Sequence, residues 1–559
     1  MTAAWLRRPA AALTWVARMA LPYAVVAVQH QLDCLYILQI ERYKPDRYGR
    51  WLLGHWRRLI PVLEIALQML TVFSAPLLIA GLGVHWVFAY LLWLGTGHLI
   101  LWRHRSLQVS QRLQHTARAV RVALVALGMS GVLGAAYVGL VAAAIPRLDL
   151  LARLCIGAIG AVAWVGIFGP GLVLLAAQVV VPVERRISRQ FLGEADRRMR
   201  AYPGRVIGIT GSYGKTTTKF IIAALLAARY RVLKTPDGVN TTMGITRIIR
   251  EELSDEHEIF VVEVAAYGPG EIREVCEILH PRLVILTSVG VQHLERFGTQ
   301  ARIAEAKYEL LASLPPGGTA VVNADDPVCL ELAERARRDG KRVVLYGTGE
   351  AAGDLAIRGV DVTVSGRGTR FRAVAGRGDS VAYETQLLGR WNLSNILAGL
   401  AAGVEWGVPL EAMREAVATL RPAPQRLEVR EEGGIVKILD VANANPRGAQ
   451  MALEVLAQFG GGSRILITPG MVELGPIEAE ENRRFGQAAA AVCDYVVLVG
   501  PEQTRPIRDG LTDRGFPQDR VLVARNADEV ADRLAGVVRP GDVLLYENRL
   551  PDTYLEAGS

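Results

Sequence analysis

The glycine-rich run Gly208-Ile-Thr-Gly-Ser-Tyr-Gly-Lys-Thr-Thr-Thr218 constrains the fold of this chain most strongly. It follows an apolar stretch at residues 205–209 and precedes an apolar, helix-like stretch at residues 219–226. A strand, a glycine turn and a helix start bind phosphate, because backbone N–H groups and the positive end of the helix dipole converge on the anion. The sequence therefore predicts an α/β domain that binds a nucleoside triphosphate.

Each residue type in this loop has a reason to be there. Glycine at positions 211 and 214 lets the backbone close around phosphate oxygens, and the lysine reaches the β- and γ-phosphates. A threonine hydroxyl on the first helical turn holds Mg²⁺. The loop departs from the G-x-x-x-x-G-K-[ST] pattern, since Ile209 stands where the first glycine is expected. The predicted ATP contacts are Gly211, Ser212, Gly214, Lys215, Thr216 and Thr217.

The apolar residues, 51% of the 559, are concentrated in the first third of the chain. A bilayer core about 30 Å thick needs roughly 20 apolar residues in a helix. Four runs are long enough, at residues 60–80, 84–102, 122–145 and 154–181. We expect about four transmembrane helices, and an interfacial helix, a fifth span or a signal peptide at residues 10–29, of which the interfacial helix is favoured.

Arginine and lysine residues cluster at residues 42–58, 103–121 and 185–200, between and after these runs. Cytoplasmic loops carry such an excess, so the rest of the chain is expected in the cytoplasm, below a multi-pass cell membrane domain. The net charge of +8 comes with these arginines and indicates contact with membrane lipid rather than nucleic acid. Five widely spaced cysteines indicate neither a zinc ribbon nor a disulfide framework.

After residue 200, short β-branched runs alternate with helical stretches, which predicts mostly parallel sheets. Runs at residues 259–264, 283–287, 320–323 and 343–346 are assigned to a first sheet, with an antiparallel addition within residues 355–388. A second series at residues 436–439, 465–468, 495–499, 521–524 and 543–546 follows a proline-containing hinge. The predicted class is α/β: a P-loop ATPase domain at 199–420 and a smaller Rossmann-like domain at 421–559, after a helical membrane domain at 1–198.

Further motifs follow the phosphate loop in a fixed order. They are Val261-Val-Glu-Val264, Thr287-Ser-Val-Gly-Val-Gln-His293, Ala306-Lys-Tyr308, Asn323-Ala-Asp-Asp-Pro327, Gly389-Arg-Trp-Asn-Leu-Ser-Asn395, Asp440-Val-Ala-Asn-Ala-Asn-Pro446 and Pro469-Gly-Met-Val-Glu-Leu-Gly475. Together they resemble the Mur ligase family over roughly residues 200–559. Within it the resemblance is greatest to the MurF branch, whose members join D-Ala-D-Ala to the muramoyl tripeptide.

The resemblance implies a ligase that phosphorylates a carboxylate and joins the acyl phosphate to an amine. Lys215, His293, Lys307 and Arg426 then have catalytic roles, and Thr216, Glu263, His293 and Lys307 hold Mg²⁺, with Lys307 carbamylated to become an anionic ligand of a second Mg²⁺. A salt bridge for Glu263 and a plain loop position for His293 are the structural alternatives. Asn323, Asn392, Asn395 and Asp440 are implied contacts of the nucleotide, with Arg426 and Asp440 closing on ATP from the second domain.

Three departures from the family bear on the substrates. Ala442 replaces an aromatic residue, Tyr546-Glu-Asn-Arg549 stands where a Lys-Gly-Ser motif is common, and apolar helices occupy the place of the UDP-binding domain. The carboxylate acceptor is therefore a small molecule or lipid-linked, and the amine is an amino acid or dipeptide. A poly-γ-glutamate synthase-like ligase, an ATP-driven transporter and an inactive scaffold are the alternatives.

Overall fold

A computed structural model describes residues 28–59, 113–144, 146, 150–348, 354–376, 378–442 and 444–550. The chain divides into two compact units, and the boundary between them falls between residues 187 and 188. Unit 1 contains residues 1–187 and 551–559, and unit 2 contains residues 188–550. Each unit has its own buried apolar clusters, so each is described by itself.

Unit 1 is helical in the residues described. It contains a helix at residues 28–40, α2 (Pro45–Leu59), α5 (Ala117–Ala144) and the first part of α6 (Leu150–Ala201). Cys34, Tyr48, Ala126 and Val173 are buried together where these helices pack. Glu184 on α6 accepts a 2.6 Å hydrogen bond from the Arg121 side chain on α5.

Two helices among the described residues are long and apolar enough to cross a membrane, Ala117–Ala144 and Ile167–Ala201. They correspond to the third and fourth runs predicted from the sequence. The first two runs, at 60–80 and 84–102, and nearly all of the segment at 10–29 lie outside the described residues. Membrane insertion therefore stays a prediction.

Unit 2 is built on two sheets. The larger has nine strands in the order β2-β3-β1-β4-β5-β6-β7-β8-β9, parallel from β2 to β7 and antiparallel from β7 to β9. The strands are β1 (Arg205–Thr210), β2 (Val232–Lys234), β3 (Ile259–Glu263), β4 (Leu283–Leu286), β5 (Thr319–Asn323), β6 (Arg342–Thr348), β7 (Ile357–Ser365), β8 (Gly368–Ala375) and β9 (Ser380–Thr385).

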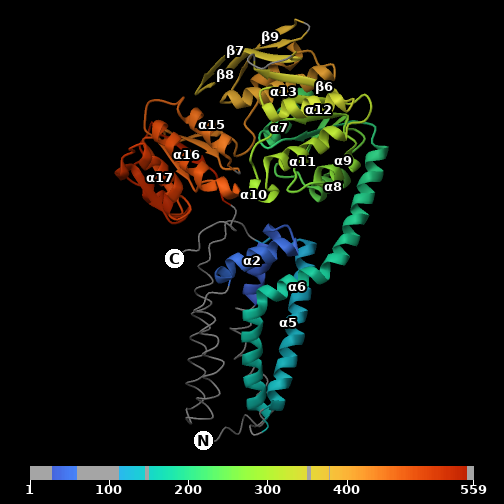
Figure 1. Cartoon of the computed structure of the whole chain (residues 1–559), viewed down its shortest axis with the longest axis vertical. Helices are drawn as coiled ribbons and strands as arrows, with labels where there is room; N and C mark the ends of the chain where they lie inside the picture. Colours follow the sequence, from blue (N-terminus) through green and yellow to red (C-terminus); the bar gives the residue numbers. More distant parts are fainter. Residues whose placement is uncertain are drawn as a thin grey trace. The chain divides into compact units, whose positions relative to one another are not determined.

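Helices cover both faces of this sheet (Figure 1). Apolar residues of its strands alternate between the faces, as Phe260 and Val262 pack on one side and Ile259 and Val261 on the other. One face packs on the end of α6, α8 (Thr242–Glu251), α9 (Glu271–Leu279), α11 (Gln300–Ala312) and α12 (Pro327–Arg338). The other face packs on α7 (Lys215–Leu226), α13 (Arg390–Glu405) and α14 (Arg414–Ala418).

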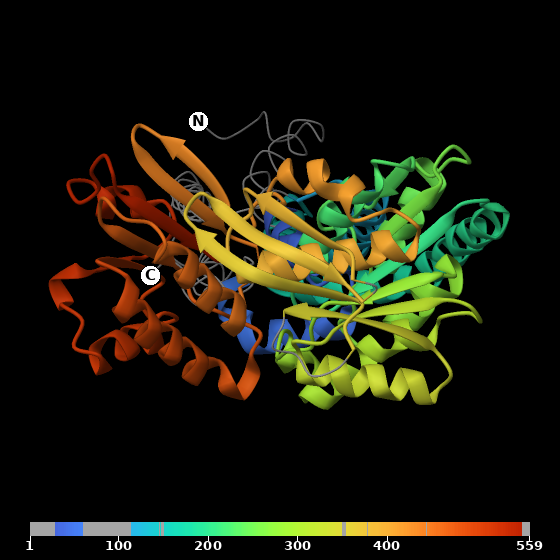
Figure 2. The ribbon, with the colours of Figure 1, turned by 90° about the horizontal axis from the view of Figure 1, so that it is seen from above.

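The smaller sheet has the order β10-β11-β15-β12-β13-β14, and only the β10–β11 pair is antiparallel. Its strands are β10 (Glu428–Glu432), β11 (Ile435–Asp440), β12 (Arg464–Thr468), β13 (Tyr495–Val499), β14 (Val521–Ala524) and β15 (Val543–Glu547). Helices α15 (Pro446–Leu456), α16 (Glu478–Val492) and α17 (Arg505–Asp513) cover one face, and α18 (Glu529–Leu534) the other. Figure 2 shows the β10–β11 hairpin in orange and the antiparallel strands β7–β9 in yellow.

The mostly parallel α/β architecture agrees with the prediction, including the antiparallel addition. Two strands were not predicted. β2 has only three residues, too few to show a pattern, and β10 reads Glu-Val-Arg-Glu-Glu, the charged composition of an exposed edge strand.

Candidate functional site

The phosphate loop connects β1 to α7 and requires glycine at two positions. Gly214 has φ 79°, and a Cβ there would lie 2.5 Å from the side-chain oxygen of Asn395. A Cβ on Gly211 would lie 2.0 Å from Thr287 Oγ1. Neither position has room for a side chain, so both require glycine.

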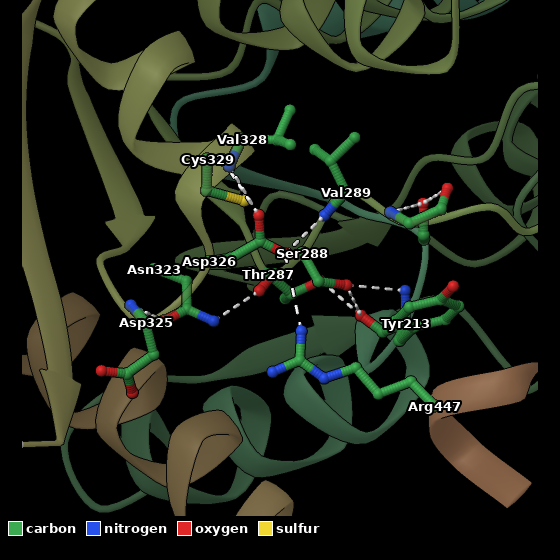
Figure 3. Close-up of polar contacts among 12 residues, drawn as sticks. Tyr213, Thr287, Ser288, Val289, Asn323, Asp325, Asp326, Val328, Cys329 and Arg447 are labelled. Atoms are coloured by element: carbon green, nitrogen blue, oxygen red, sulfur yellow. Dashed lines mark hydrogen bonds and ion pairs between the residues drawn. The ribbon is translucent and has the colours of Figure 1, made fainter. Parts of the chain in front are cut away.

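The loop is fixed in place by the segment after β4 (Figure 3). Ser212 N donates to the Ser288 carbonyl at 2.8 Å, and Ser288 Oγ accepts from Tyr213 N at 2.9 Å. Ser212 Oγ also donates to the Gly290 carbonyl at 3.1 Å. The Ser212 side chain therefore supports the loop, a role that the sequence had not indicated.

Lys215 folds back over this loop. Its Nζ donates to the carbonyls of Gly211 at 2.8 Å and Ser212 at 3.1 Å. Burial lowers the pKa of Lys215 to about 8, against the opposing charge of Glu263. The amine therefore lies at the loop whose backbone would bind phosphate oxygens, and its contact with the nucleotide stays a prediction.

Glu263 ends β3, which lies beside β1, and its carboxylate is buried with 2% exposure. Thr216 Oγ1 donates to it at 2.8 Å, and Asn240 Nδ2 donates at 3.0 Å. Lys219 Nζ, which is fully buried, forms an ion pair with it at 3.1 Å. Glu263 therefore forms the salt bridge that the sequence analysis gave as the structural alternative. Of the two predicted threonines, Thr216 rather than Thr217 bonds this carboxylate.

Lys307 lies on α11 and is 5% exposed, unlike an ordinary helix lysine. Burial lowers its pKa to about 7, and the charge of Lys215 lowers it further. The carboxylates of Glu263, Glu309 and Glu271 act in the opposite direction. Lys307 therefore lies within electrostatic range of Lys215 and Glu263, and its role as a metal ligand stays a prediction.

Thr216 and Glu263 supply adjoining oxygen donors, which suit Mg²⁺. The described residues contain no group of three or more His, Cys, Asp or Glu side chains that could hold a metal ion. The two oxygen donors fit a Mg²⁺ that also takes ligands from nucleotide phosphates and water, as Mg²⁺ commonly does.

His293 is not at the end of a strand, which corrects the sequence-based placement. β4 ends at Leu286, and His293 precedes the short helix α10 (Leu294–Phe297) with φ 60°. Its Nδ1 is hydrogen-bonded to Glu473, which also accepts from Arg296. The Tyr267 ring lies 4.7 Å from the imidazole, centroid to centroid. Burial lowers the pKa of His293, which favours the neutral ring that can bind a metal.

The side-chain amides of the three asparagines predicted to contact the nucleotide differ in the hydrogen bonds they already make. Asn323 ends β5, and its Nδ2 donates to the Thr287 carbonyl at 2.8 Å. Asn392 Nδ2 donates to the Leu388 carbonyl at 2.8 Å, so this amide serves the start of its own helix. Asn395 accepts from Thr218 Oγ1 at 3.1 Å, while its buried Nδ2 has no hydrogen-bond partner in the described residues. Of the three, Asn395 is the one whose amide nitrogen makes no hydrogen bond among the described residues.

Arg426 and Asp440 lie together in the smaller α/β body. Arg426 Nη1 donates to the Ala442 carbonyl at 2.9 Å, and its buried Nε has no partner among the described residues. Burial raises the pKa of Asp440 to about 6, although the charge of Arg426 opposes the shift. The structure brings this predicted pair together.

Several residues at the site were missed from the sequence. Arg447 on α15 lies 4.0 Å from Asp326 and 4.6 Å from the Trp391 ring, measured from the guanidinium carbon in the second case (Figure 3). Asp326 itself accepts from Val289 N at 3.1 Å and caps α12. The missed residues are Lys219, Asn240, Arg296, Asp326, Arg447 and Glu473. Lys219 follows the threonine run, Asp326 lies in the Asn323-to-Pro327 motif and Glu473 lies in the Pro469-to-Gly475 motif, so a sequence pattern could have identified these three.

Glu547 provides a pH-dependent test of the smaller sheet. It is 1% exposed, lies opposite Asp440 in the β11–β15 register, and accepts from Thr468 Oγ1 at 2.9 Å. Burial and the charge of Asp440 raise its pKa to about 8. A raised carboxyl pKa means that the folded state keeps a proton that the unfolded chain loses, so stability falls as pH rises from about 4.5 to 8.

We expect Glu547→Gln to remove much of this pH dependence, because glutamine stays neutral. Urea unfolding at pH 6 and pH 8.5 should show the variant gaining stability relative to the unchanged protein at the higher pH. Equal pH dependence in both proteins would show that Glu547 is not the group responsible.

Comparison with known proteins agrees with this geometry. Residues 209–403 match the Mur ligase middle domain, and residues 425–546 match the Mur ligase, glutamate ligase domain. UDP-N-acetylmuramoyl-tripeptide–D-alanyl-D-alanine ligase of Bacillus subtilis is 31% identical over 61% of this chain and 72% of its own. The same-named Escherichia coli enzyme is 30% identical over 60% of this chain and 74% of its own.

A solved structure gives the same result. MurF from Thermotoga maritima in complex with ADP superposes with a TM-score of 0.58 at 28% identity, covering 66% of this chain and 81% of that one. The ordered motifs, the two α/β sheets and these matches converge on one family. The chain belongs to the Mur ligase family and is an ATP-dependent ligase.

Proposed function

We propose that this chain is a membrane-anchored ligase of the MurF type, which joins an amine to an activated carboxylate during synthesis of a cell-wall or cell-envelope precursor. The observation that carries the proposal is the convergence of Lys215, Glu263 and Lys307 at the phosphate loop. They occur in a chain that is 31% identical to a D-alanyl-D-alanine-adding ligase over most of that enzyme.

The chemistry has two steps. A carboxylate oxygen of the acceptor attacks the γ-phosphorus of ATP, the bond to the β-phosphate oxygen breaks, and ADP leaves. The amine then attacks the acyl carbon, loses a proton, and releases inorganic phosphate that retains the carboxylate oxygen. Lys215 and the loop N–H groups stabilise the charge that develops on the transferred phosphoryl group.

Mg²⁺ would be held by Thr216 and Glu263 and would supply charge neutralisation at the phosphates. Lys219 compensates the charge of Glu263 and Asn240 orients its carboxylate, since both contact it directly. Arg426 and Asp440 contribute from the smaller α/β body, whose closure over the loop brings the two halves of the site together.

Lys307 is proposed to be carbamylated, because a buried amine with lowered pKa has the neutral form that reacts with carbon dioxide. We expect native mass spectrometry of protein kept in bicarbonate to show one added carbon dioxide, which is absent in Lys307→Ala. Activity of the unchanged protein should fall when carbon dioxide is removed and return with bicarbonate. An unmodified Lys307 in a fully active protein would refute this.

The proposed substrates are a small-molecule or lipid-linked carboxylate and an amino acid or dipeptide such as D-Ala-D-Ala. A second candidate, a poly-γ-glutamate synthase-like ligase with a polymeric acceptor, is favoured by the two long apolar helices α5 and α6. We propose a multi-pass protein of the cell membrane, with residues 1–198 as its membrane domain and 199–420 and 421–559 as cytoplasmic ligase domains. Anchoring would concentrate the enzyme where lipid-linked precursors are found.

The acyl-phosphate step is tested with an acceptor whose carboxylate is labelled with ¹⁸O. The muramoyl tripeptide with D-Ala-D-Ala is the first pair to try, and a γ-glutamyl oligomer with glutamate is the second. The proposal predicts that ¹⁸O appears in the released inorganic phosphate. Product formation with unlabelled phosphate would contradict this mechanism, and labelled phosphate with only the second pair would favour the alternative acceptor.

A further inference from the structure

Glu473, in the loop after β12, contacts His293 of the larger α/β body through its carboxylate. Glu473 is hydrogen-bonded to His293 Nδ1 through one oxygen and to Arg296 Nη2 through the other. Its carbonyl accepts from Glu295 N at 3.2 Å. Glu473 therefore bonds three residues of the 293–296 turn, although the side chains it contacts are 177 to 180 residues away in the sequence.

The backbone at both ends of this contact is in an uncommon conformation. His293 has φ 60° and Glu473 has φ 65°, a left-handed region that non-glycine residues rarely adopt. Such conformations persist where surrounding contacts determine them. The two residues meet side chain to side chain, and both are largely buried, with side-chain exposures of 14% and 9%.

The contact also determines which ring nitrogen of His293 is available. Nδ1 is committed to Glu473, whereas Nε2 has no hydrogen-bond partner among the described residues. A carboxylate on one imidazole nitrogen fixes the tautomer and the ring orientation, and it raises the basicity of the other nitrogen. The Tyr267 ring beside the imidazole and the Arg296 guanidinium over Tyr267 further limit rotation.

Resting on the proposed function, we propose that Glu473 is a positioning residue. It holds His293 with Nε2 available to the metal of the nucleotide site, and it does so from the smaller α/β body. Docking of the smaller α/β body against the larger one then completes the metal site, because the Glu473 carboxylate that orients His293 belongs to the smaller body. This assigns a role to the Pro469-to-Gly475 motif, which the proposed mechanism does not otherwise use.

The test measures metal binding rather than turnover. The full-length protein in detergent is saturated with a non-hydrolysable ATP analogue and titrated with Mn²⁺, and free Mn²⁺ is followed by electron paramagnetic resonance. We expect Glu473→Ala to weaken Mn²⁺ binding about 10- to 100-fold. Glu473→Gln should lose less, because its amide oxygen still accepts the Nδ1 proton.

Arg483→Ala is the matched control, since Arg483 also lies in the smaller α/β body but pairs with Asp513 of that same body, at 2.7 Å. Its Mn²⁺ affinity should stay close to that of the unchanged protein at saturating analogue. Unchanged Mn²⁺ affinity in folded Glu473→Ala would overturn the inference. If the alanine variant does not fold, unchanged affinity in folded Glu473→Gln would do so. An equal loss in Arg483→Ala would also overturn it, because the loss would then not depend on the contact with His293.

Failure of the proposed function would be seen separately. It would appear as an absence of substrate-dependent phosphate release by the unchanged protein, whereas Mn²⁺ binding to the analogue complex needs no turnover.

Discussion

Replacing Lys215 by methionine is expected to lower the rate of ligation about a thousandfold, the scale of removing one preorganised group that stabilises transition-state charge. Lys215 Nζ lies over the phosphate loop on the carbonyls of Gly211 and Ser212. Methionine keeps the length and apolar character of the side chain, so the loop should remain folded. The measurement is the initial rate of product formation at saturating ATP and substrates.

Lys437→Met is the control for this change. Lys437 lies on the β10–β11 hairpin, is paired with Glu432 at 2.6 Å, and does not contact the loop. Its activity should match that of the unchanged protein. A Lys215→Met variant that retains a tenth or more of the activity would show that this lysine does not stabilise the reacting phosphates.

Replacing Lys219 by methionine is expected to lower the free energy of unfolding by about 3 kcal/mol, because it leaves the buried Glu263 carboxylate without its ion-pair partner. Lys219 is 0% exposed and bonds both Glu263, at 3.1 Å, and the Pro236 carbonyl, at 2.9 Å. Lys215 still lies near Glu263 and offsets part of the loss. Urea unfolding followed by tryptophan fluorescence measures the change.

A double-mutant cycle gives this prediction its control. Glu263→Gln combined with Lys219→Met removes both charges and should recover part of the stability lost in the single variant. The exposed pair between Arg483 and Asp513, 2.7 Å apart, provides a comparison, since Arg483→Met should cost less than about 1 kcal/mol. If Lys219→Met and Arg483→Met lowered the free energy of unfolding equally, the assigned role of Lys219 would be contradicted.

Local patterns were sufficient for much of the fold. The order of strand, glycine loop and helix at residues 205–226 is encoded in adjacent residues, and the structure has it as β1, the loop and α7. The β-branched runs predicted most strands of both sheets, because buried parallel strands consist of continuous apolar residues. Strand β10 was not predicted, because an exposed edge strand carries charged residues instead of a continuous apolar run.

The contacts that complete the site depend on residues far apart in the sequence. Glu263 was predicted as a metal ligand, but its pairing with Lys219 depends on α7 lying against β3. The bond from His293 to Glu473 spans 180 residues and needs both sheets in place. The bond from Asn392 to the Leu388 carbonyl is local by contrast, but the spacing of the asparagines does not show it, because it depends on the backbone geometry at the start of α13.

The most direct test of the ligase assignment is the coupling of ATP hydrolysis to both substrates. Purified full-length protein with Mg²⁺ and ATP is supplied with the carboxylate alone, the amine alone, or both, and released phosphate is measured alongside the amide product. The account predicts sustained phosphate release only with both substrates, in a ratio of one phosphate to one amide bond. Equal phosphate release in the absence of either substrate would contradict it.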